Sequence, residues 1–451
     1  MHATIAQYAE LRVPRYTSYP PAPRFAAEVD GGRYGDWLAE LPKDAALSLY
    51  LHVPFCKKVC WYCACNMKLA AREDPVRAYG AVLQREIALV AGRLPGRMAV
   101  ASVHWGGGTP TSMPLDALAA LMTDLRAAFA LAPDAEVAFE LDPRTFAAEA
   151  APALAAMGAT RASLGVQEFD PKVQAAVNRI QPYDVVRATV ERLRAVGIGS
   201  INFDLMYGLP FQTEETLART VAQTAGLRPD RVALFGYAHV PWMAKNQRMV
   251  PEAALPGAAE RFAQAEAAAR LLVEHGYERI GLDHFALPDD AMAVAARAGT
   301  LARNFQGYTV DGADALIGLG ATSISALPQG YVQNITETGA YSRAVTEGHL
   351  PVARGYALAG EDRLRRAVIE RLMCDLAVDL DAVARAHGYA PGHFAPELAR
   401  CGQFVEDGLA RVEGSLLTVP EAGRAALRVV ASLFDQHLAP EGGQRRHAVA
   451  V

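Results

Sequence analysis

The chain has 451 residues, 51% of them hydrophobic and 21% charged, with a net charge of −5 at pH 7. This length exceeds one ordinary core and predicts a large domain with a smaller one beside it. The slightly acidic balance argues against a general nucleic-acid surface, which needs a basic stripe, so no nucleic-acid partner is expected.

The first segment, residues 1–44, is predicted to be an irregular arm with a short helix near Gly32–Leu41, because it holds several prolines and little periodicity. It lacks the apolar stretch and cleavage site of a secretory signal. No stretch of the chain reaches the roughly 18 apolar residues of a membrane span. We therefore expect a cytoplasmic protein with no membrane partner.

The central region, residues 45–345, alternates short β-rich apolar runs with helical stretches. The predicted strands cover 47–53, 101–105, 136–141, 161–166, 201–207, 231–237 and 277–283, and the clearest helices cover 74–94 and 213–227. This alternation predicts an α/β fold with a parallel sheet, closed as a barrel or an incomplete barrel. In such folds the loops that follow the strands build the active site.

The pattern changes in the last part of the chain, residues 346–451. An amphipathic helix is predicted at 361–376, and a hairpin at 408–419 within further helices. This order is typical of a small, mostly helical, winged-helix-like domain. Because the chain is acidic overall, packing or substrate cover is a better interpretation than DNA binding.

Four of the six cysteines lie in one short segment, "FCKKVCWYCAC", directly after the first predicted strand. In a cytoplasmic protein, clustered cysteines are more often metal ligands or redox groups than disulfides. Reduced thiols packed as small apolar groups are the alternative. The neighbouring Lys57 and Lys58 make that alternative less favourable.

Two metal-binding interpretations compete for this segment. Structural zinc usually takes two close cysteine pairs joined by a longer spacer, and only one residue separates Cys63 from Cys65. Thiolates at Cys56, Cys60 and Cys63 have the spacing C-x3-C-x2-C, which can hold three corners of a 4Fe–4S cluster and leave one iron open. The spacing favours the cluster, with zinc as the alternative.

The C-x3-C-x2-C pattern, with an aromatic residue before its last cysteine, resembles the radical S-adenosylmethionine (radical SAM) superfamily. Within it, the segments "HWGGGTPT", "ELDPRT", "LGVQEFD", "NFDLMYGLPFQT" and "RYTSYP" are similar to the oxygen-independent coproporphyrinogen III oxidases, or dehydrogenases. The resemblance implies an incomplete (β/α) barrel of the radical SAM type. It also implies oxidative decarboxylation of two propionates of coproporphyrinogen III to vinyl groups, through a 5′-deoxyadenosyl radical. The product would be protoporphyrinogen IX, in haem biosynthesis.

The same resemblance implies the cofactors and their sites. One 4Fe–4S cluster is expected on Cys56, Cys60 and Cys63, together with S-adenosylmethionine, expected as two molecules. The matched cofactor positions are Tyr50, Tyr62, Gly107, Gly108, Thr109, Glu140, Gln167, Arg179, Asp204, Ala238 and Ile324. Of these, Gln167, Arg179 and Asp204 are expected around the second molecule.

Some of these positions can also be interpreted without the resemblance. The glycines of "HWGGGTP" let backbone approach a ligand closely, although a plain tight turn before a helix is the alternative. Glu140 ends a predicted strand and can accept hydrogen bonds from an ammonium or a ribose, or it is a surface acid. "IGLGATS" at 317–323 lacks the third glycine of a dinucleotide site, so no nicotinamide cofactor is expected.

Cys65 and His52 are the candidate catalytic residues. Cys65 either acts near the substrate, tunes the cluster or is structural, and His52 is either close to the cluster or a packed histidine. A haem chaperone of the same fold is the nearest rival function, but such relatives typically lack the cysteine at position 65 and the "RYTSYP" arm. A zinc-stabilised binding module is the rival from another class.

The expected substrate is a tetracarboxylate, which arginine binds well because its fork pairs with both carboxylate oxygens. Three arginines of the arm could cover or bind it, with ordinary surface roles as an equal alternative: Arg12, Arg15 and Arg24. The electron donor is expected to be a flavodoxin or a ferredoxin. We expect a monomer.

Overall fold

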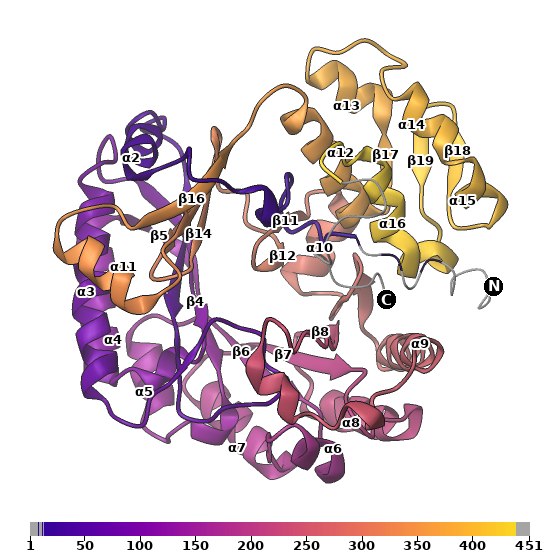
Figure 1. Cartoon of the computed structure of the whole chain (residues 1–451). Helices are drawn as coiled ribbons and strands as arrows, with labels where there is room; N and C mark the ends of the chain where they lie inside the picture. Colours follow the sequence, from indigo (N-terminus) through magenta and orange to yellow (C-terminus); the bar gives the residue numbers. More distant parts are fainter. Residues whose placement is uncertain (1–7, 9–10, 12, 439–451) are drawn as a thin grey trace.

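The computed structural model describes residues 8, 11 and 13–438 and contains a main sheet of 12 strands (Figure 1). The middle of the sheet is parallel, as predicted. Its parallel strands, in their order in the sheet, are β13 (Ala315–Leu319), β1 (Leu47–Val53), β4 (Ala99–Gly107), β5 (Ala130–Leu141), β6 (Arg161–Gln167), β7 (Ser200–Tyr207) and β8 (Arg231–Gly236). The sheet has two free ends, so the barrel is incomplete, which confirms the predicted fold class.

Both ends of the sheet are antiparallel, which the sequence patterns did not indicate. One end carries β14 (Ile324–Leu327), β15 (Gly330–Asn334) and β16 (Val352–Ala357), and the other carries β10 (His284–Ala286) and β9 (Glu278–Ile280). The strand predicted at 277–283 is therefore shorter than expected and antiparallel to its neighbour. Short connections, as between β9 and β10, allow only antiparallel pairing, because a parallel crossover needs a dozen residues or more.

Helices flank the sheet, because the βα units return along its outside. They are α2 (Gly31–Ala39), α3 (Asp74–Ala91), α4 (Leu115–Ala128), α5 (Ala150–Ala156), α6 (Pro171–Ala176), α7 (Tyr183–Ala195), α8 (Glu214–Leu227), α9 (Ala258–Glu274), α10 (Ala291–Ala298) and α11 (Thr338–Thr346). The helices predicted at 74–94 and 213–227 are confirmed as α3 and α8. Thr213 starts α8 because its side chain accepts a hydrogen bond from the Thr216 N–H.

The C-terminal unit lies beside the barrel and mixes short helices with a small sheet (Figure 1). Its elements are α12 (Asp362–Asp375), β17 (Ala377–Asp379), α13 (Leu380–Ala386), α14 (Ala395–Arg400), α15 (Gly402–Glu406), β18 (Arg411–Glu413), β19 (Leu416–Thr418) and α16 (Leu427–Ala431). Strands β18 and β19 form the predicted hairpin, and β17 pairs with β19. The change of architecture comes after β16, later than residue 346, because β16 still pairs within the main sheet.

The N-terminal arm packs on both units. Its helix α2 contributes Trp37 and Leu38 to the core of the barrel. Before it, Tyr16 and Tyr19 belong to the separate core of the C-terminal unit. Of the three arm arginines considered above, Arg12 lies outside the described residues. Within the part of the chain that the structure describes, no helix is long and apolar enough to cross a membrane.

Candidate active site

The cysteine segment forms a loop at the carboxyl end of β1, where a barrel carries its chemistry. The loop begins with β2 (Phe55–Cys56) and ends with β3 (Lys68–Leu69), and these two short strands pair with each other. The N–H of Ala70 donates to the carbonyl oxygen of Cys56 at 3.0 Å. The loop therefore closes on itself and presents its cysteines from one short piece of chain.

Side chains from distant loops hold the backbone of the cysteine loop. The Asn246 amide donates at 3.1, 3.1 and 2.8 Å to the carbonyl oxygens of Cys60, Trp61 and Cys63. The next residue, Gln247, donates to the carbonyl oxygens of Tyr62 at 2.7 Å and Ala238 at 3.1 Å. Asn178 donates to the carbonyl oxygen of Val59 at 2.8 Å. These contacts place the loop without using its thiols.

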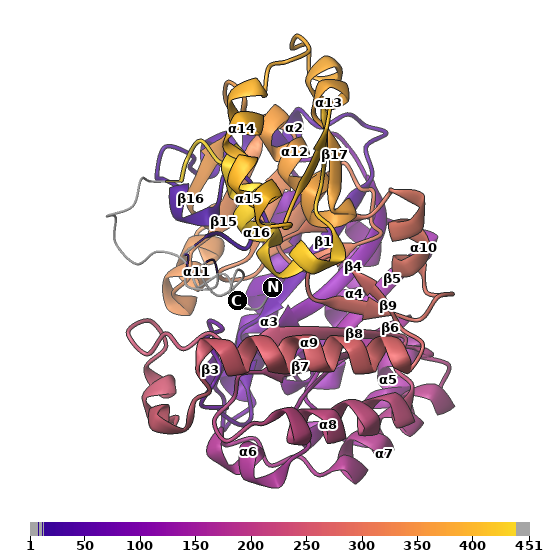
Figure 2. The same cartoon turned by 90° about the vertical axis from the view of Figure 1, so that its right-hand side faces the viewer.

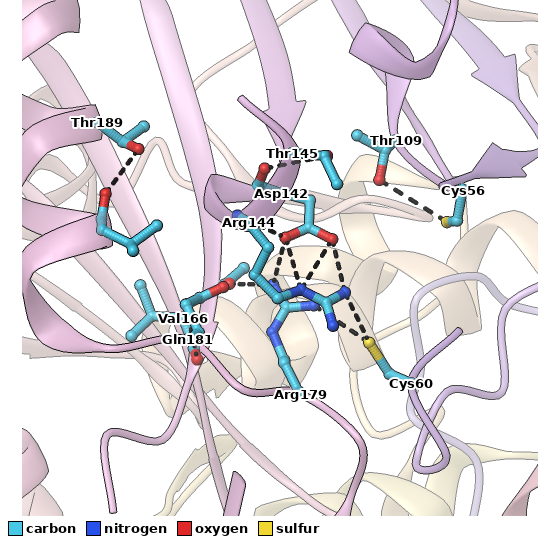
Figure 3. Close-up of polar contacts among 12 residues, drawn as sticks. Cys56, Cys60, Thr109, Asp142, Arg144, Thr145, Val166, Arg179, Gln181 and Thr189 are labelled. Carbon is cyan, nitrogen blue, oxygen red and sulfur yellow. Dashed lines mark hydrogen bonds and ion pairs between the residues drawn. The ribbon is translucent and has the colours of Figure 1, made fainter. Parts of the chain in front are cut away.

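The thiol of Cys60 is buried against two arginines (Figure 3). Arg144 Nη2 and Arg179 Nη1 lie 3.1 and 3.3 Å from its sulfur. Asp142 stands between the same guanidinium groups, 2.6 Å from Arg144 Nη2 and 3.5 Å from Arg179 Nη2. Two guanidinium groups thus donate hydrogen bonds to this sulfur, which lies in a positively charged surrounding.

The other thiols of the pattern also fit a cluster. All six cysteines are free of disulfides, and the Cys56 sulfur lies 3.7 Å from the Thr109 hydroxyl. Among the described residues, no three histidine, cysteine or carboxylate side chains are placed to share a single metal ion. A mononuclear zinc site needs such convergence, whereas a 4Fe–4S cluster binds each thiolate at a different iron. Cys56, Cys60 and Cys63 are therefore all available as ligands.

The glycine turn that follows β4 packs directly against the cysteine loop. Gly107 has φ +110°, and a Cβ there would lie 2.7 Å from the imidazole of His52. A Cβ on Gly108 would lie 2.5 Å from the carbonyl oxygen of Phe55. Since side chains at these positions would collide with the neighbouring segments, the turn needs glycine to let the backbone approach so closely.

Glu140, which lies near the end of β5, faces this turn. Its carboxylate accepts the Gly107 N–H at 3.1 Å and contacts His104 Nε2 at 3.0 Å. Although burial opposes it, these partners hold the pKa of Glu140 below its usual value. A carboxylate that stays ionised can accept hydrogen bonds from an ammonium or a ribose, as the resemblance implies for this position.

The two candidate catalytic residues lie next to the glycine turn and in the cysteine loop, respectively. His52 is buried, and its imidazole contacts the Tyr50 hydroxyl at 3.1 Å and the carbonyl oxygen of Asn66 at 3.4 Å. Burial lowers the pKa of His52, so its neutral form is favoured. Cys65 is exposed, and its N–H lies 3.4 Å from the Cys63 sulfur. Their catalytic roles stay predictions.

The positions expected around a second cofactor molecule lie at the end of β6, after β6 and within β7. Gln167 has φ +68° at the end of β6, where the register with β7 shifts. Arg179 donates to the carbonyl oxygen of Gly165, which lies two residues before Gln167. On β7, Asp204 accepts from Asn202 at 2.9 Å, and burial followed by the charge of Glu140 raises the pKa of Asp204 to about 6. These residues line the same end of the sheet as Glu140.

The remaining positions are connected to this group through the backbone. Ala238 follows β8 and shares Gln247 with the cysteine loop. Ile324 begins β14 beside Gly318, where a Cβ would lie 2.7 Å from the Ile324 carbonyl oxygen. Gly318 in turn pairs with Tyr50 of β1. The structure thus brings the predicted cofactor positions to one end of the barrel.

Sequence reasoning missed the residues that hold the loop. Asn178, Asn246 and Gln247 carried no signal, because single amides in loops are ordinary surface residues until the fold joins them. Asp142 and Arg144 do have a sequence signal, since "DPRT" directly follows the strand predicted at 136–141. Of the arm arginines, Arg15 lines a cavity between the barrel and the C-terminal unit, and Arg24 closes a short turn before the bridge between Ala26 and Gly355.

Comparison with known proteins agrees with this geometry. A model of the radical SAM superfamily matches residues 50–223, which include the cysteine loop and the glycine turn. The structure is also similar to that of coproporphyrinogen III oxidase from Escherichia coli, described as a radical SAM enzyme, with a TM-score of 0.90 and 37% identity over 94% of this chain and 98% of that one. The fold and the site thus define a radical SAM protein, a class that uses a 4Fe–4S cluster and S-adenosylmethionine.

Similarity to curated relatives is closer and covers the whole chain. The oxygen-independent coproporphyrinogen III oxidase of Bradyrhizobium diazoefficiens is 49% identical over 452 residues, covering 100% of both chains. That of Paracoccus denitrificans is 43% identical over 98% of this chain and 97% of its own. The chain belongs to the family of oxygen-independent coproporphyrinogen III oxidases.

Proposed function

We propose that this protein converts coproporphyrinogen III to protoporphyrinogen IX without oxygen, by oxidative decarboxylation of two propionate side chains to vinyl groups. The observation that carries the proposal is the cysteine loop facing the glycine turn, at the carboxyl ends of the strands, in a chain that matches these oxidases along its full length. The reaction belongs to haem biosynthesis, and we place it in the cytoplasm.

Cys56, Cys60 and Cys63 would hold the cluster, and Gly107 and Glu140 lie on the turn and strand that face the cysteine loop. When bound there, the cluster and S-adenosylmethionine supply one-electron radical chemistry that no protein side chain provides. The chain contributes cationic donors to the Cys60 thiolate, through Arg144 and Arg179. Ionised Glu140 would orient a positively charged amino group, and the glycines of the turn let it pack against His52 and Phe55 beside the cysteine loop.

A second S-adenosylmethionine is proposed beside the first, on the face formed by Gln167, Arg179 and Asp204. Asp204 supports this, because a carboxyl with a pKa of about 6 can hold or release a proton near neutral pH. His52 is proposed to act with Tyr50, whose hydroxyl it contacts. Cys65 is exposed beside the cluster ligands and is proposed to act near the substrate or to tune the cluster.

The electron donor is proposed to be a flavodoxin or a ferredoxin. Lys57 and Lys58 are exposed on the cysteine loop, so a positive surface lies next to the proposed cluster. Such a surface would attract an acidic donor protein and speed its encounter. We further propose a monomer, divided into an arm, a barrel that ends with β16, and a C-terminal winged-helix-like domain.

The proposal is tested by anaerobic turnover of the reconstituted protein with reductant, S-adenosylmethionine and coproporphyrinogen III, with cell extract as the electron acceptor. We expect stepwise loss of two carboxyl groups from the porphyrin, coupled to formation of 5′-deoxyadenosine, with both followed by mass spectrometry. Protein prepared without iron is the matched control and should do neither. Formation of 5′-deoxyadenosine with unchanged porphyrin mass, together with haem binding, would instead point to a haem chaperone.

A further inference from the structure

A cavity of about 270 Å³ lies where the barrel, the arm and the C-terminal unit meet. Helix α9 and the C-terminal unit border it and lie one above the other in Figure 2. Its walls come from separate segments: Arg15 of the arm, Tyr207 of β7, Tyr237 after β8, Arg261 of α9, Arg303 of β11 (Ala302–Asn304) and Arg428 of α16. No single stretch of sequence forms it.

The charges around this cavity are unbalanced. Five arginines line it, against two carboxylates, Glu266 and Asp283. Arg279, the fifth arginine, already pairs with Glu266 at 3.1 Å and with Glu421 at 2.9 Å. Asp283 accepts from His284 at 2.7 Å. Asp283 is the other carboxylate of the lining, and it is already engaged by a histidine.

Two of these guanidinium groups have buried nitrogens without acceptors. Among the described residues, Nε of Arg261 and both Nε and Nη1 of Arg303 have no hydrogen-bond partner. Arg303 uses Nη2 on the carbonyl oxygen of Arg15 at 3.3 Å and lies 4.3 Å above the ring of Tyr308. Buried donors without partners are costly, so the site is suited to an anionic ligand that brings acceptors.

The pKa values of Arg428 and Arg261 also favour an anionic ligand in this cavity. Burial, followed by repulsion from Arg15, lowers the pKa of Arg428 to about 10. Burial also lowers the pKa of Arg261, again with a contribution from Arg15. A bound carboxylate would relieve this repulsion between like charges.

Two residues that line the cavity are also connected to, or close in sequence to, residues of the proposed active site. Ala238 lines the cavity, and its carbonyl oxygen accepts the same Gln247 amide that holds Tyr62 of the cysteine loop. Tyr207, another lining residue, lies three positions after Asp204 at the carboxyl end of β7. The cavity therefore borders the carboxyl ends of β7 and β8, close to a residue that holds the cysteine loop.

We infer that this cavity binds propionate carboxylates of the porphyrinogen that are not the ones reacting, through Arg15, Arg261, Arg303 and Arg428. The inference rests on the proposed function. A volume of about 270 Å³ lies below the usual range of sites that enclose a whole drug-sized ligand, so the cavity takes the edge of the macrocycle with its side chains. The aromatic rings of Tyr207 and Tyr237 suit the pyrrole edge, and the guanidinium forks suit the carboxylates.

Binding of coproporphyrin III, the oxidised tetracarboxylate, to the cluster-loaded protein tests the inference by fluorescence titration. Arg261→Gln and Arg303→Gln should each weaken binding at least about tenfold, as expected for loss of a charge-assisted hydrogen bond. Arg261→Lys should recover part of the affinity, because it keeps the charge without the fork. Arg270→Gln is the matched control, since Arg270 lies on α9 with its side chain 67% exposed.

The tetramethyl ester of coproporphyrin III separates carboxylate binding from packing. It should bind more weakly to the unaltered protein and should lose no further affinity in Arg261→Gln. Unchanged tetracarboxylate affinity in both glutamine variants would overturn the inference, and so would an equal loss of affinity for the ester.

A turnover assay distinguishes a failure of this inference from a failure of the proposed function. If the inference holds, Arg261→Gln raises KM for coproporphyrinogen III while the cluster absorbance and S-adenosylmethionine binding stay as in the unaltered protein. An unaltered protein that binds the tetracarboxylate but never decarboxylates it would contradict the proposed function and leave the carboxylate site standing. Unaltered KM in Arg261→Gln, in a protein that turns over normally, would overturn only the inference.

Discussion

The cysteine loop and the arginine cavity show two ways of building a site. The cysteine loop carries its proposed ligands within one short segment, and distant side chains hold its backbone and contact the Cys60 sulfur. The arginine cavity takes its charged residues from the arm, the barrel and the C-terminal unit. The spacing of residues along the sequence therefore predicts the cysteine loop but not the arginine cavity. The loop depends on its own chemistry, whereas the cavity depends on how the units pack.

The largest effect is expected from removing a thiol of the cysteine loop. Cys60→Ala should abolish cluster binding and 5′-deoxyadenosine formation, because a ligand buried between two arginines is lost. Iron content and visible absorbance after anaerobic reconstitution measure this. Cys374→Ala, which changes a buried cysteine outside the loop, should keep its iron. Full iron in Cys60→Ala would show that Cys60 is not a ligand.

The next largest effect is expected in the glycine turn. Gly107→Ala places a Cβ at φ +110° and 2.7 Å from His52, at a cost of about 1–3 kcal/mol. If that cost falls on the bound state, S-adenosylmethionine affinity should drop by roughly 10- to 100-fold. The cluster should still assemble. Equilibrium dialysis measures the affinity, and Gly96→Ala is the control because a Cβ there meets nothing within 4 Å.

A smaller effect should follow from loosening the backbone of the cysteine loop. Asn246→Ala removes one amide that serves three carbonyl oxygens, and each lost hydrogen bond contributes about 0.5–1.5 kcal/mol. We expect the cluster to assemble but to release iron to a chelator several times faster. Coproporphyrin affinity should not change, since the arginine cavity keeps its residues. An unchanged release rate would mean that the loop holds its shape without this anchor.

The smallest effect concerns the pH dependence of stability. The folded-state pKa of Asp204 is raised to about 6, above its ordinary value of 3.8, mainly by burial. Above pH 3.8 the folded state therefore binds more protons than the unfolded state, and stability falls as pH rises. Between about pH 5 and pH 7 the free energy of unfolding should fall by about 1 kcal/mol. Asp204→Asn should remove that slope in thermal unfolding scans of the protein, and an equally steep slope in the variant would contradict the assignment.

Prediction of the fold succeeded where elements repeat with the period of their structure. "LSLYLHV" is β1 from its first residue to its last, since its aliphatic residues alternate with Ser48, Tyr50 and His52 at the period of two of a strand. Strands β14 to β16 were missed, because their apolar residues are spaced by turns and glycines rather than by βα units. Likewise β10 has three residues, too few for any period to appear.

For the site, the sequence by itself determined the thiols, their spacing and the glycines that must lie beside them. These properties are local, because iron coordination and close backbone approach need particular residues at particular separations. Tertiary structure alone decided which amides hold the cysteine loop, and that Arg15, Arg261, Arg303 and Arg428 share one cavity. Long side chains on separate elements have no common spacing in the chain, so only the packing of arm, barrel and C-terminal unit brings their charges together.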